Sequence, residues 1–247
     1  MKDRELDLAD IDALKVNAKT NINDGHSLID GIMDVELYAR ANPRILWVLK
    51  ESVDYGDYRP LDEWMKERFS NRDGLGHTYQ MMGYVSYALL SDKEETWQSI
   101  PVEFPPDGLK GSAESLKHVA IINAKKWWGD SKSDAKEVVR GYQDHRDHIA
   151  AQVDAYKPDV VIFGYSDAYL EIVADIYRNA EGQELDSGRI AQEGSLTIFK
   201  GSRHPERLYF WAYHPSYRKS DQTKGEYCME IVRAYRQFGP KRDAMPS

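Results

Sequence analysis

The chain has 247 residues, of which 41% are hydrophobic and 30% are charged, and six Phe, six Trp and sixteen Tyr supply bulky core side chains. This composition excludes intrinsic disorder for most of the chain and suits one large α/β domain. A net charge of −8 excludes binding to nucleic acid through overall positive charge, so any such contact has to be local.

The first 44 residues carry apolar side chains at helical spacing, in two groups separated by the Asn-Asp-Gly sequence at 23–25. This pattern predicts two amphipathic helices before the first strand, including one through Ile32 and Leu37. We therefore expect residues 1–44 to form an N-terminal helical segment packed on the core. Residues 239–247 are polar and are expected to form a C-terminal tail.

The rest of the chain alternates apolar runs with amphipathic stretches. Strands are predicted at 45–49, 119–123, 159–164, 195–200 and 207–213. Helices are predicted at about 61–69, 77–90, 133–156, 168–173 and 221–238. This order predicts an α/β fold, a three-layer α/β/α sandwich around a central, mostly parallel sheet of about four to five strands, within residues 45–238.

Polar side chains that could catalyse a reaction or bind a ligand follow four of these strands. In open α/β sheets, ligands bind beyond the carboxyl ends of the strands. The segments that follow the strand ends are 50–52, 123–126, 164–166 and 214–216. Together they supply a carboxylate, an amide, lysines and an imidazole, so we expect the functional site at this edge.

In order along the chain, these segments resemble the motifs of the uracil-DNA glycosylase superfamily. ILWVLKES at 45–52 resembles the first motif, in which a strand runs into a loop that carries a water-activating acid. YFWAYHPSYR at 209–218 resembles the second, a His-Pro-Ser loop, and a strand ending in Asn123 and KPDVVIFG at 157–164 lie between them. The resemblance covers about 45–238. It implies hydrolysis of the N-glycosidic bond of a flipped uracil or damaged base in DNA.

The resemblance also implies catalytic roles for two residues. Glu51 takes the position of the family's catalytic aspartate, where it would orient a water or stabilise the cationic sugar. His214 would donate a hydrogen bond to the oxygen of the departing base. The first motif lacks the Gly-Gln-Asp-Pro-Tyr-His sequence of the best-known branch, and Val53 stands where that branch has a tyrosine that excludes thymine.

Other residues would bind the DNA. Asn123 offers a donor and an acceptor to the base edge, and an aromatic side chain would stack on the base. The candidates for stacking are Tyr55, Tyr58 and Tyr79. Phosphates of the DNA strand would contact a cluster of four basic side chains and one hydroxyl group. The cluster consists of Lys125, Lys126, Arg218, Lys219 and Ser216.

Simpler interpretations of the same residues stay open. Glu51 can be an exposed carboxylate paired with Lys50 or Arg59, and Asn123 can serve only to turn the chain after its strand. Two other functions also remain: a non-catalytic member of the same fold that binds a nucleotide or nucleic acid, or a metal-free hydrolase of a small N-glycoside. The divergent loop after the first strand favours the non-catalytic binder.

Location and cofactors follow from a few residues. Cys228 is the only cysteine, which excludes a disulfide framework and a cysteine-based metal site and fits the cytoplasm. The N-terminus lacks the apolar stretch of an export signal. His145 and His148 lie three apart in a helix without a third ligand at suitable spacing, so we expect a solvated helical face there. We expect no metal or other cofactor, no membrane contact, and a monomer with DNA as its partner.

Overall fold

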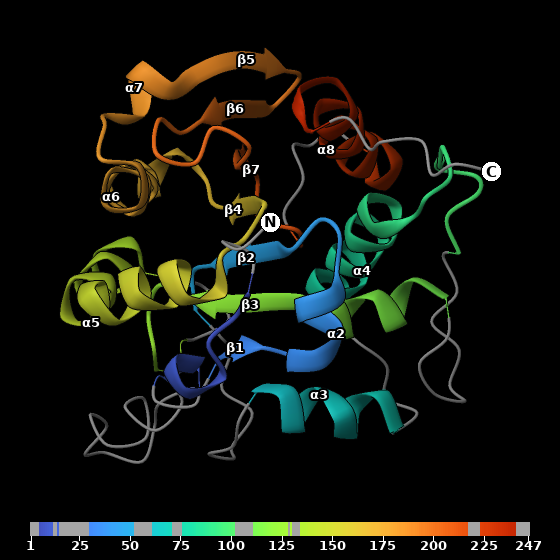
Figure 1. The fold of residues 1–247 in the computed structure, drawn as a ribbon, viewed down its shortest axis with the longest axis horizontal. Coiled ribbons are helices and arrows are strands. Elements are labelled where there is room, and N and C mark those ends of the chain that lie inside the picture. Colours follow the sequence, from blue (N-terminus) through green and yellow to red (C-terminus); the bar gives the residue numbers. More distant parts are fainter. Residues whose placement is uncertain are drawn as a thin grey trace.

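The computed structural model of the protein describes residues 5–11, 14, 30–51, 61–70, 76–101, 111–127, 129, 134–216 and 223–240. Its strands are β1 (Gly31–Ile32), β2 (Ile45–Leu49), β3 (Val119–Asn123), β4 (Val160–Gly164), β5 (Arg189–Glu193), β6 (Leu196–Lys200) and β7 (Leu208–Ala212). They form one seven-stranded mixed sheet in the order β1-β3-β2-β4-β7-β6-β5 (Figure 1).

The centre of the sheet is parallel. β2 lies between β3 and β4, and β4 also pairs with β7, all in parallel register. Every residue of β2, β3 and β4 is buried, which is why these strands read as continuous apolar runs. β1, β5 and β6 pair in antiparallel register at the two sides of the sheet.

Helices cover both faces of this sheet. The α-helices are α2 (Val35–Arg40), α3 (Leu61–Ser70), α4 (His77–Leu90), α5 (Ala135–Tyr156), α6 (Leu170–Glu181), α7 (Leu185–Gly188) and α8 (Lys224–Phe238). Two 3₁₀ helices, η2 (Gly111–His118) and η3 (Asp167–Tyr169), precede β3 and α6. No helix in the described part of the chain has both the length and the apolar content needed to cross a membrane.

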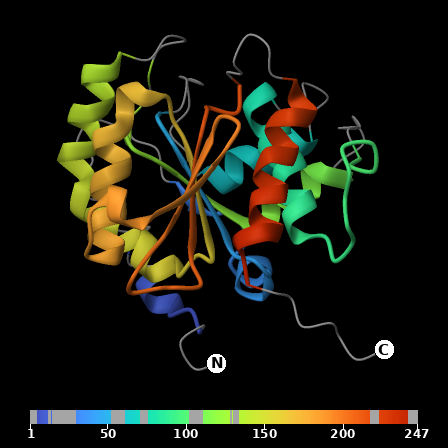
Figure 2. The same ribbon diagram turned by 90° about the horizontal axis from the view of Figure 1, so that it is seen from above.

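The layers are clear from above the sheet, where α5 and α6 lie on one side and α4 and α8 on the other (Figure 2). Alternation along β2 divides its side chains between them. Trp47 and Leu49 pack in the apolar cluster with α4 and α8, whereas Leu46 and Val48 pack in the cluster with α5 and α6. Successive side chains of a strand point to opposite faces of the sheet, so a strand that is buried on both faces contributes to a core on each side.

The five strands predicted from sequence are confirmed, but the predicted number of four to five is wrong. The two additional strands are the edges of the sheet. β1 has only two residues, and β5, with the sequence RIAQE, is largely exposed. β1 is too short to show a period, and β5 needs no apolar run because it is a largely exposed edge strand.

The N-terminal segment is also more than a pair of helices. Ile32 lies in β1 rather than in the helix predicted through it, and β1 pairs with β3. Only the shorter α2 follows, where Asp34 caps the helix by accepting from the Leu37 N–H at 3.0 Å. Leu6 and Ile11 are buried in the cluster with α5 and α6. The segment before residue 45 therefore contributes both a strand and core side chains.

We predict that Gly31→Ala destabilises the protein. Gly31 has a φ of +147°, and an added Cβ would lie 2.5 Å from the Tyr156 hydroxyl oxygen of α5. Strain of this kind costs about 1–3 kcal/mol. Urea unfolding measures the loss, with Gly76→Ala as the control, because nothing lies within 4 Å of its added Cβ. Equal stability of the two variants would contradict the tight packing of β1 on α5.

Candidate active site at the carboxyl edge of the sheet

Four chain segments leave the parallel strands at the same edge of the sheet. Leu49 at the end of β2 pairs with Asn123 at the end of β3, and Gly164 at the end of β4 pairs with Ala212 at the end of β7. Backbone hydrogen bonds continue the pairing past the strands, as between Lys125 N–H and the Lys50 carbonyl at 2.8 Å. The strands lie in the order β3, β2, β4, β7. The segments that carry Asn123 and Glu51 therefore start next to each other, and β4 separates them from the segment that carries His214.

Glu51 is buried and held by a lysine. Its Oε2 accepts a hydrogen bond from Lys125 Nζ at 2.7 Å, and the two side chains are only 3% and 2% exposed. Glu137 of α5, which is largely exposed, binds the same Nζ at 3.2 Å. Burial lowers the pKa of Lys125, but its bonds to Glu51 and Glu137 outweigh this and raise the pKa above the usual value. The lysine is therefore charged and fixes one oxygen of Glu51.

The second oxygen of Glu51 is different. Oε1 is buried and has no hydrogen-bond partner among the residues that the structure describes. The Glu51 carboxylate also lies against Gly129, where an added Cβ would overlap it. A buried carboxylate oxygen without a partner is costly, and its natural partner is a water or a ligand group. Glu51 therefore offers one free acceptor from an otherwise fixed side chain.

Asn123 and Lys126 belong to a separate buried cluster around Asp30. Lys126 Nζ binds Asp30 Oδ1 at 2.7 Å and Oδ2 at 3.0 Å, and it also donates to Gln152 Oε1 of α5 at 2.8 Å. The backbone N–H and the side-chain amide of Asn123 donate to Asp30 Oδ2 at 2.6 and 3.3 Å. Asp30, just before β1, thus ties the end of β3 to α5.

These contacts correct the predicted phosphate-binding role of two lysines. Lys126 is buried, and its three acceptor contacts come from Asp30 and Gln152. Lys125 is buried as well and is occupied by Glu51 and Glu137. Neither ammonium group is available to a DNA phosphate. The alternative that Glu51 is an exposed carboxylate paired with Lys50 or Arg59 is also wrong, since Glu51 is buried against Lys125.

His214 is a neutral hydrogen-bond donor. Its Nδ1 accepts from the Ser216 backbone N–H at 3.3 Å and lies 2.8 Å from Ser216 Oγ. Burial, together with the charge of Lys50, lowers the pKa of His214 to about 3. The imidazole is then uncharged at neutral pH, and since Nδ1 is an acceptor, the proton is on Nε2. The hydroxyl of the exposed Ser216 is directed to this ring, so it is less available to bind a phosphate.

Gly164 provides the space for the His-Pro-Ser loop. An added Cβ at Gly164 would lie 2.9 Å from Leu49 Cδ2 and 3.1 Å from Pro215 Cδ. The end of β4 thus contacts both the strand before Glu51 and the loop that carries His214. The close approach fixes the distance between these two segments.

Lys50 interacts electrostatically with both candidate catalytic groups, Glu51 and His214. It is half-buried, and its Nζ lies 5.8 Å from the centroid of the Tyr169 ring at the start of α6. Burial lowers the pKa of Lys50, while the charge of Glu51 raises it in part. Its ammonium group has no ion pair within the described ranges, in contrast to Lys125 and Lys126.

The remaining predicted site residues divide into two groups. Tyr79 is buried on α4 within the apolar cluster of that face, at 7% exposure, and is not an open stacking platform. Tyr55, Tyr58, Arg218 and Lys219 lie outside the described residues.

The histidine pair of α5 is half-buried and not on a solvated face. His145 Nδ1 donates to the Gly141 carbonyl at 3.0 Å, and its ring lies against Trp127. Burial and the charge of Lys126 lower the pKa of His148 to about 4. Within the described ranges, no three His, Cys, Asp or Glu side chains are grouped as a metal site would require.

The sequence analysis did not identify Asp30 as a site residue, and it assigned no role to Lys50 although Lys50 lies in the segment 50–52 expected at the site. Asp30 lies before the region of resemblance, and its only sequence signal is a single acid within the apolar stretch LIDGIM. A charge in such a stretch is either exposed or paired in the interior. The close approach of Gly129 to the Glu51 carboxylate could not be predicted, because Glu51 is far away in the sequence.

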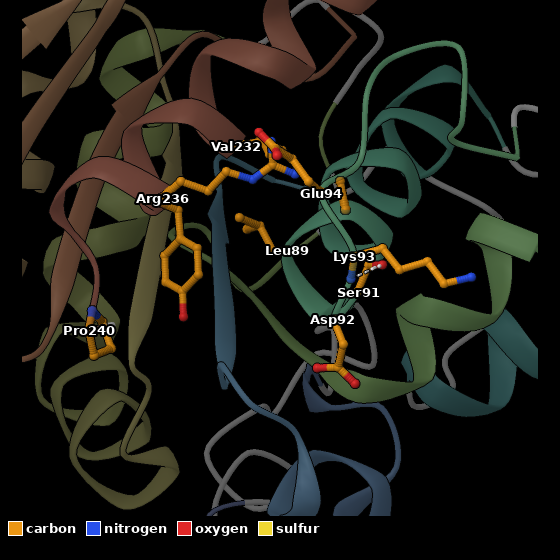
Figure 3. A pocket seen from close by; sticks show the side chains of 10 residues that line it. Leu89, Ser91, Asp92, Lys93, Glu94, Val232, Arg236 and Pro240 are labelled. Carbon is orange, nitrogen blue, oxygen red and sulfur yellow. Dashed lines mark hydrogen bonds and ion pairs between the residues drawn. The ribbon is translucent and has the colours of Figure 1, made fainter. Parts of the chain in front are cut away.

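Two pockets lie at the opposite edge of the sheet from the candidate site. Tyr227 near the start of α8 donates to the Tyr213 carbonyl beside the candidate site at 2.8 Å, so the far end of α8 reaches the amino edge. There, a pocket of about 280 Å³ lies between the ends of α4 and α8, lined by Leu89, Val232 and Arg236 among others (Figure 3). Arg40 and His118, which precede β2 and β3, line the second pocket.

The chain matches no protein-family model, and no curated protein matches it.

We predict that Asp30→Asn strongly destabilises the protein. The substitution leaves the Lys126 ammonium without its counterion in the interior, and breaking a buried pair in this way costs about 3–5 kcal/mol. Urea unfolding measures the loss. Glu36→Gln is the matched control, because Glu36 is 85% exposed and its pair with Arg40 spans 4.0 Å. A small effect of Asp30→Asn would show that Lys126 is not charged in the folded protein.

We predict that His214 does not titrate near neutral pH. NMR of the imidazole C–H groups, assigned with His214→Gln, should show proton uptake near pH 3. Lys50→Gln should raise the midpoint by removing a positive charge. Since the unfolded chain binds this proton near pH 6.5, acidification from about 6.5 to about 3 lowers the free energy of unfolding. An ordinary midpoint near 6.5 would contradict the burial of the ring.

Proposed function

We propose that the protein is a DNA glycosylase of the uracil-DNA glycosylase-like type, which hydrolyses the N-glycosidic bond of a flipped uracil or damaged base. The observation that carries the proposal is the free, buried Oε1 of Glu51 at the same sheet edge as the neutral, donating imidazole of His214. Glu51 belongs to the first motif of the sequence resemblance and His214 to the second. The overall fold, with ligand-facing loops after parallel strands, suits the reaction.

Cleavage of an N-glycosidic bond develops opposite charges on its two halves. The sugar becomes cationic, and the Glu51 carboxylate would stabilise it and orient a water toward C1′ through Oε1. The base departs with negative charge on its oxygen, to which His214 Nε2–H would donate. A neutral donor suits this task because it forms the bond as the charge develops and does not have to lose a proton.

Asn123 retains part of its capacity to read a base. Its amide donates once to Asp30 and is only 2% exposed, so its second N–H and its carbonyl oxygen would meet a pyrimidine edge only if the base entered the interior beside Asp30. Asp30 fixes the orientation of the amide, which is the condition for selective pairing. Phosphate binding falls to Arg218, Lys219 and the backbone of the loops, since Lys125 and Lys126 are occupied.

A second function is favoured by one observation. Lys125 binds Oε2 of Glu51 at 2.7 Å, so only one oxygen of the carboxylate remains to orient a water. A member of the same fold that binds a nucleotide or nucleic acid without cleaving it would tolerate such a pair. The two functions differ in turnover and not in binding.

The test is the release of uracil from an oligonucleotide that carries one uracil, in single- and double-stranded form. Alkali then cleaves the abasic sites, and denaturing gels measure the product. Glu51→Gln should lower the rate by about 10²–10⁴, the contribution of a positioned acid or base. His214→Ala should lower it by about 10²–10³, the effect of losing a donor to developing negative charge.

Two matched variants serve as controls. Glu36→Gln and His204→Ala repeat the same chemical changes at exposed positions away from the carboxyl edge, and both should keep the wild-type rate. Binding of the oligonucleotide without cleavage would replace the glycosylase with the non-catalytic binder. Turnover of free nucleosides alone would indicate a small N-glycoside hydrolase.

A further inference from the structure

Among the three lysines that directly follow the ends of β2 and β3, Lys50 is the one that is neither ion-paired with a described residue nor fully buried. Lys125 is held by two glutamates and Lys126 by Asp30 and Gln152. Lys50 Nζ instead lies over the Tyr169 ring, 5.8 Å from its centroid. The groups around this amine are Glu51 on its own segment, His214 after β7 and Tyr169 before α6.

These surroundings favour a reactive amine. A lysine that is charged and paired is not a nucleophile, whereas one in a partly desolvated site without a counterion becomes neutral more easily. Burial lowers the pKa of Lys50 and outweighs the charge of Glu51, which raises it; the face of the Tyr169 ring also favours the charged form. His214 adds no positive charge at neutral pH, and Glu51 shares its own charge with Lys125. The amine is thus close enough to interact electrostatically with both the group proposed to act at C1′ and the group proposed to meet the departing base.

We propose that Lys50 gives the protein a second activity, cleavage of an abasic DNA strand through an imine between its Nζ and C1′ of the abasic sugar. This inference rests on the proposed function, because removal of a base leaves an abasic sugar in this site. The sugar opens to an aldehyde, which is the electrophile that an amine requires.

The chemistry balances without a further reactant. The Nζ lone pair forms a bond to the aldehyde carbon C1′, and the carbonyl oxygen leaves as water. The proton on C2′ then passes to the Glu51 carboxylate, the electron pair forms a double bond between C2′ and C3′, and the 3′ phosphate leaves. Water hydrolyses the imine and returns the free amine.

Borohydride trapping tests this step. An oligonucleotide with a preformed abasic site is mixed with the full-length protein, and sodium borohydride reduces any imine to a stable amine. Denaturing gels should show a covalent complex, with the cross-link mapped to Lys50 by peptide mass spectrometry. Lys50→Arg and Lys50→Met should each lower the trapped fraction about tenfold or more, since neither side chain can form the imine.

Lys93→Arg is the matched control, because Lys93 lines the pocket at the opposite edge, and it should trap as the wild type does. Thermal unfolding of both Lys50 variants establishes that they are folded. Trapping by the wild type should increase from about pH 6 to about pH 9, as the amine loses its proton. A cross-link to another residue, or equal trapping by folded Lys50→Arg, would overturn the proposal.

The preformed abasic site separates this inference from the proposed function. Trapping at Lys50 without release of uracil would support the lyase step and reject base removal. Release of uracil without trapping would support the glycosylase and reject the role of Lys50. Absence of both results would reject both.

Discussion

The buried ion pair of Asp30 and Lys126 constrains the rest of the structure. A charged lysine in the interior is stable only with a counterion and further hydrogen bonds, and breaking such a pair is far more costly than exposing both groups. Asp30 provides the counterion and also binds the backbone of Asn123, and Gln152 completes the cluster from α5. The segment before β2 is therefore part of the same folding unit as the sheet, and a chain that began at residue 45 would leave Lys126 unpaired.

The same principle determines which charges the site presents. Three lysines follow the ends of β2 and β3, and two of them are neutralised by a fixed carboxylate. The described groups directly after the ends of β2, β3 and β7 then include a free carboxylate oxygen of Glu51, the uncharged imidazole of His214 and the amine of Lys50. The net charge of −8 is thus no obstacle to local chemistry on an anionic polymer, because the relevant potential is set within a few ångströms of the strand ends.

The sequence was sufficient for the central strands and for the edge at which the site lies. Continuous apolar runs identify β2, β3 and β4 because both faces of these strands are covered, and polar residues after parallel strands must meet at one edge. The ion-pair partners of the two lysines after β3 were not predictable from the sequence. Lys125 and Lys126 are adjacent in sequence but point to different carboxylates, and no local pattern distinguishes an ammonium that faces Glu51 from one that faces Asp30. The edge strands were missed for a related reason, since two residues of β1 and the polar β5 carry no apolar period.

The two edge strands of the sheet affect how molecules of this protein can associate. β5 exposes charged side chains, its register shifts between Arg189 and Ala191, and Glu193 is tied to Arg233 of α8 at 2.7 Å. At the other side, β1 is only two residues long. Among the described strands, neither margin presents a long regular row of open backbone donors and acceptors. Copies crowded together in solution are thereby discouraged from joining their sheets edge to edge.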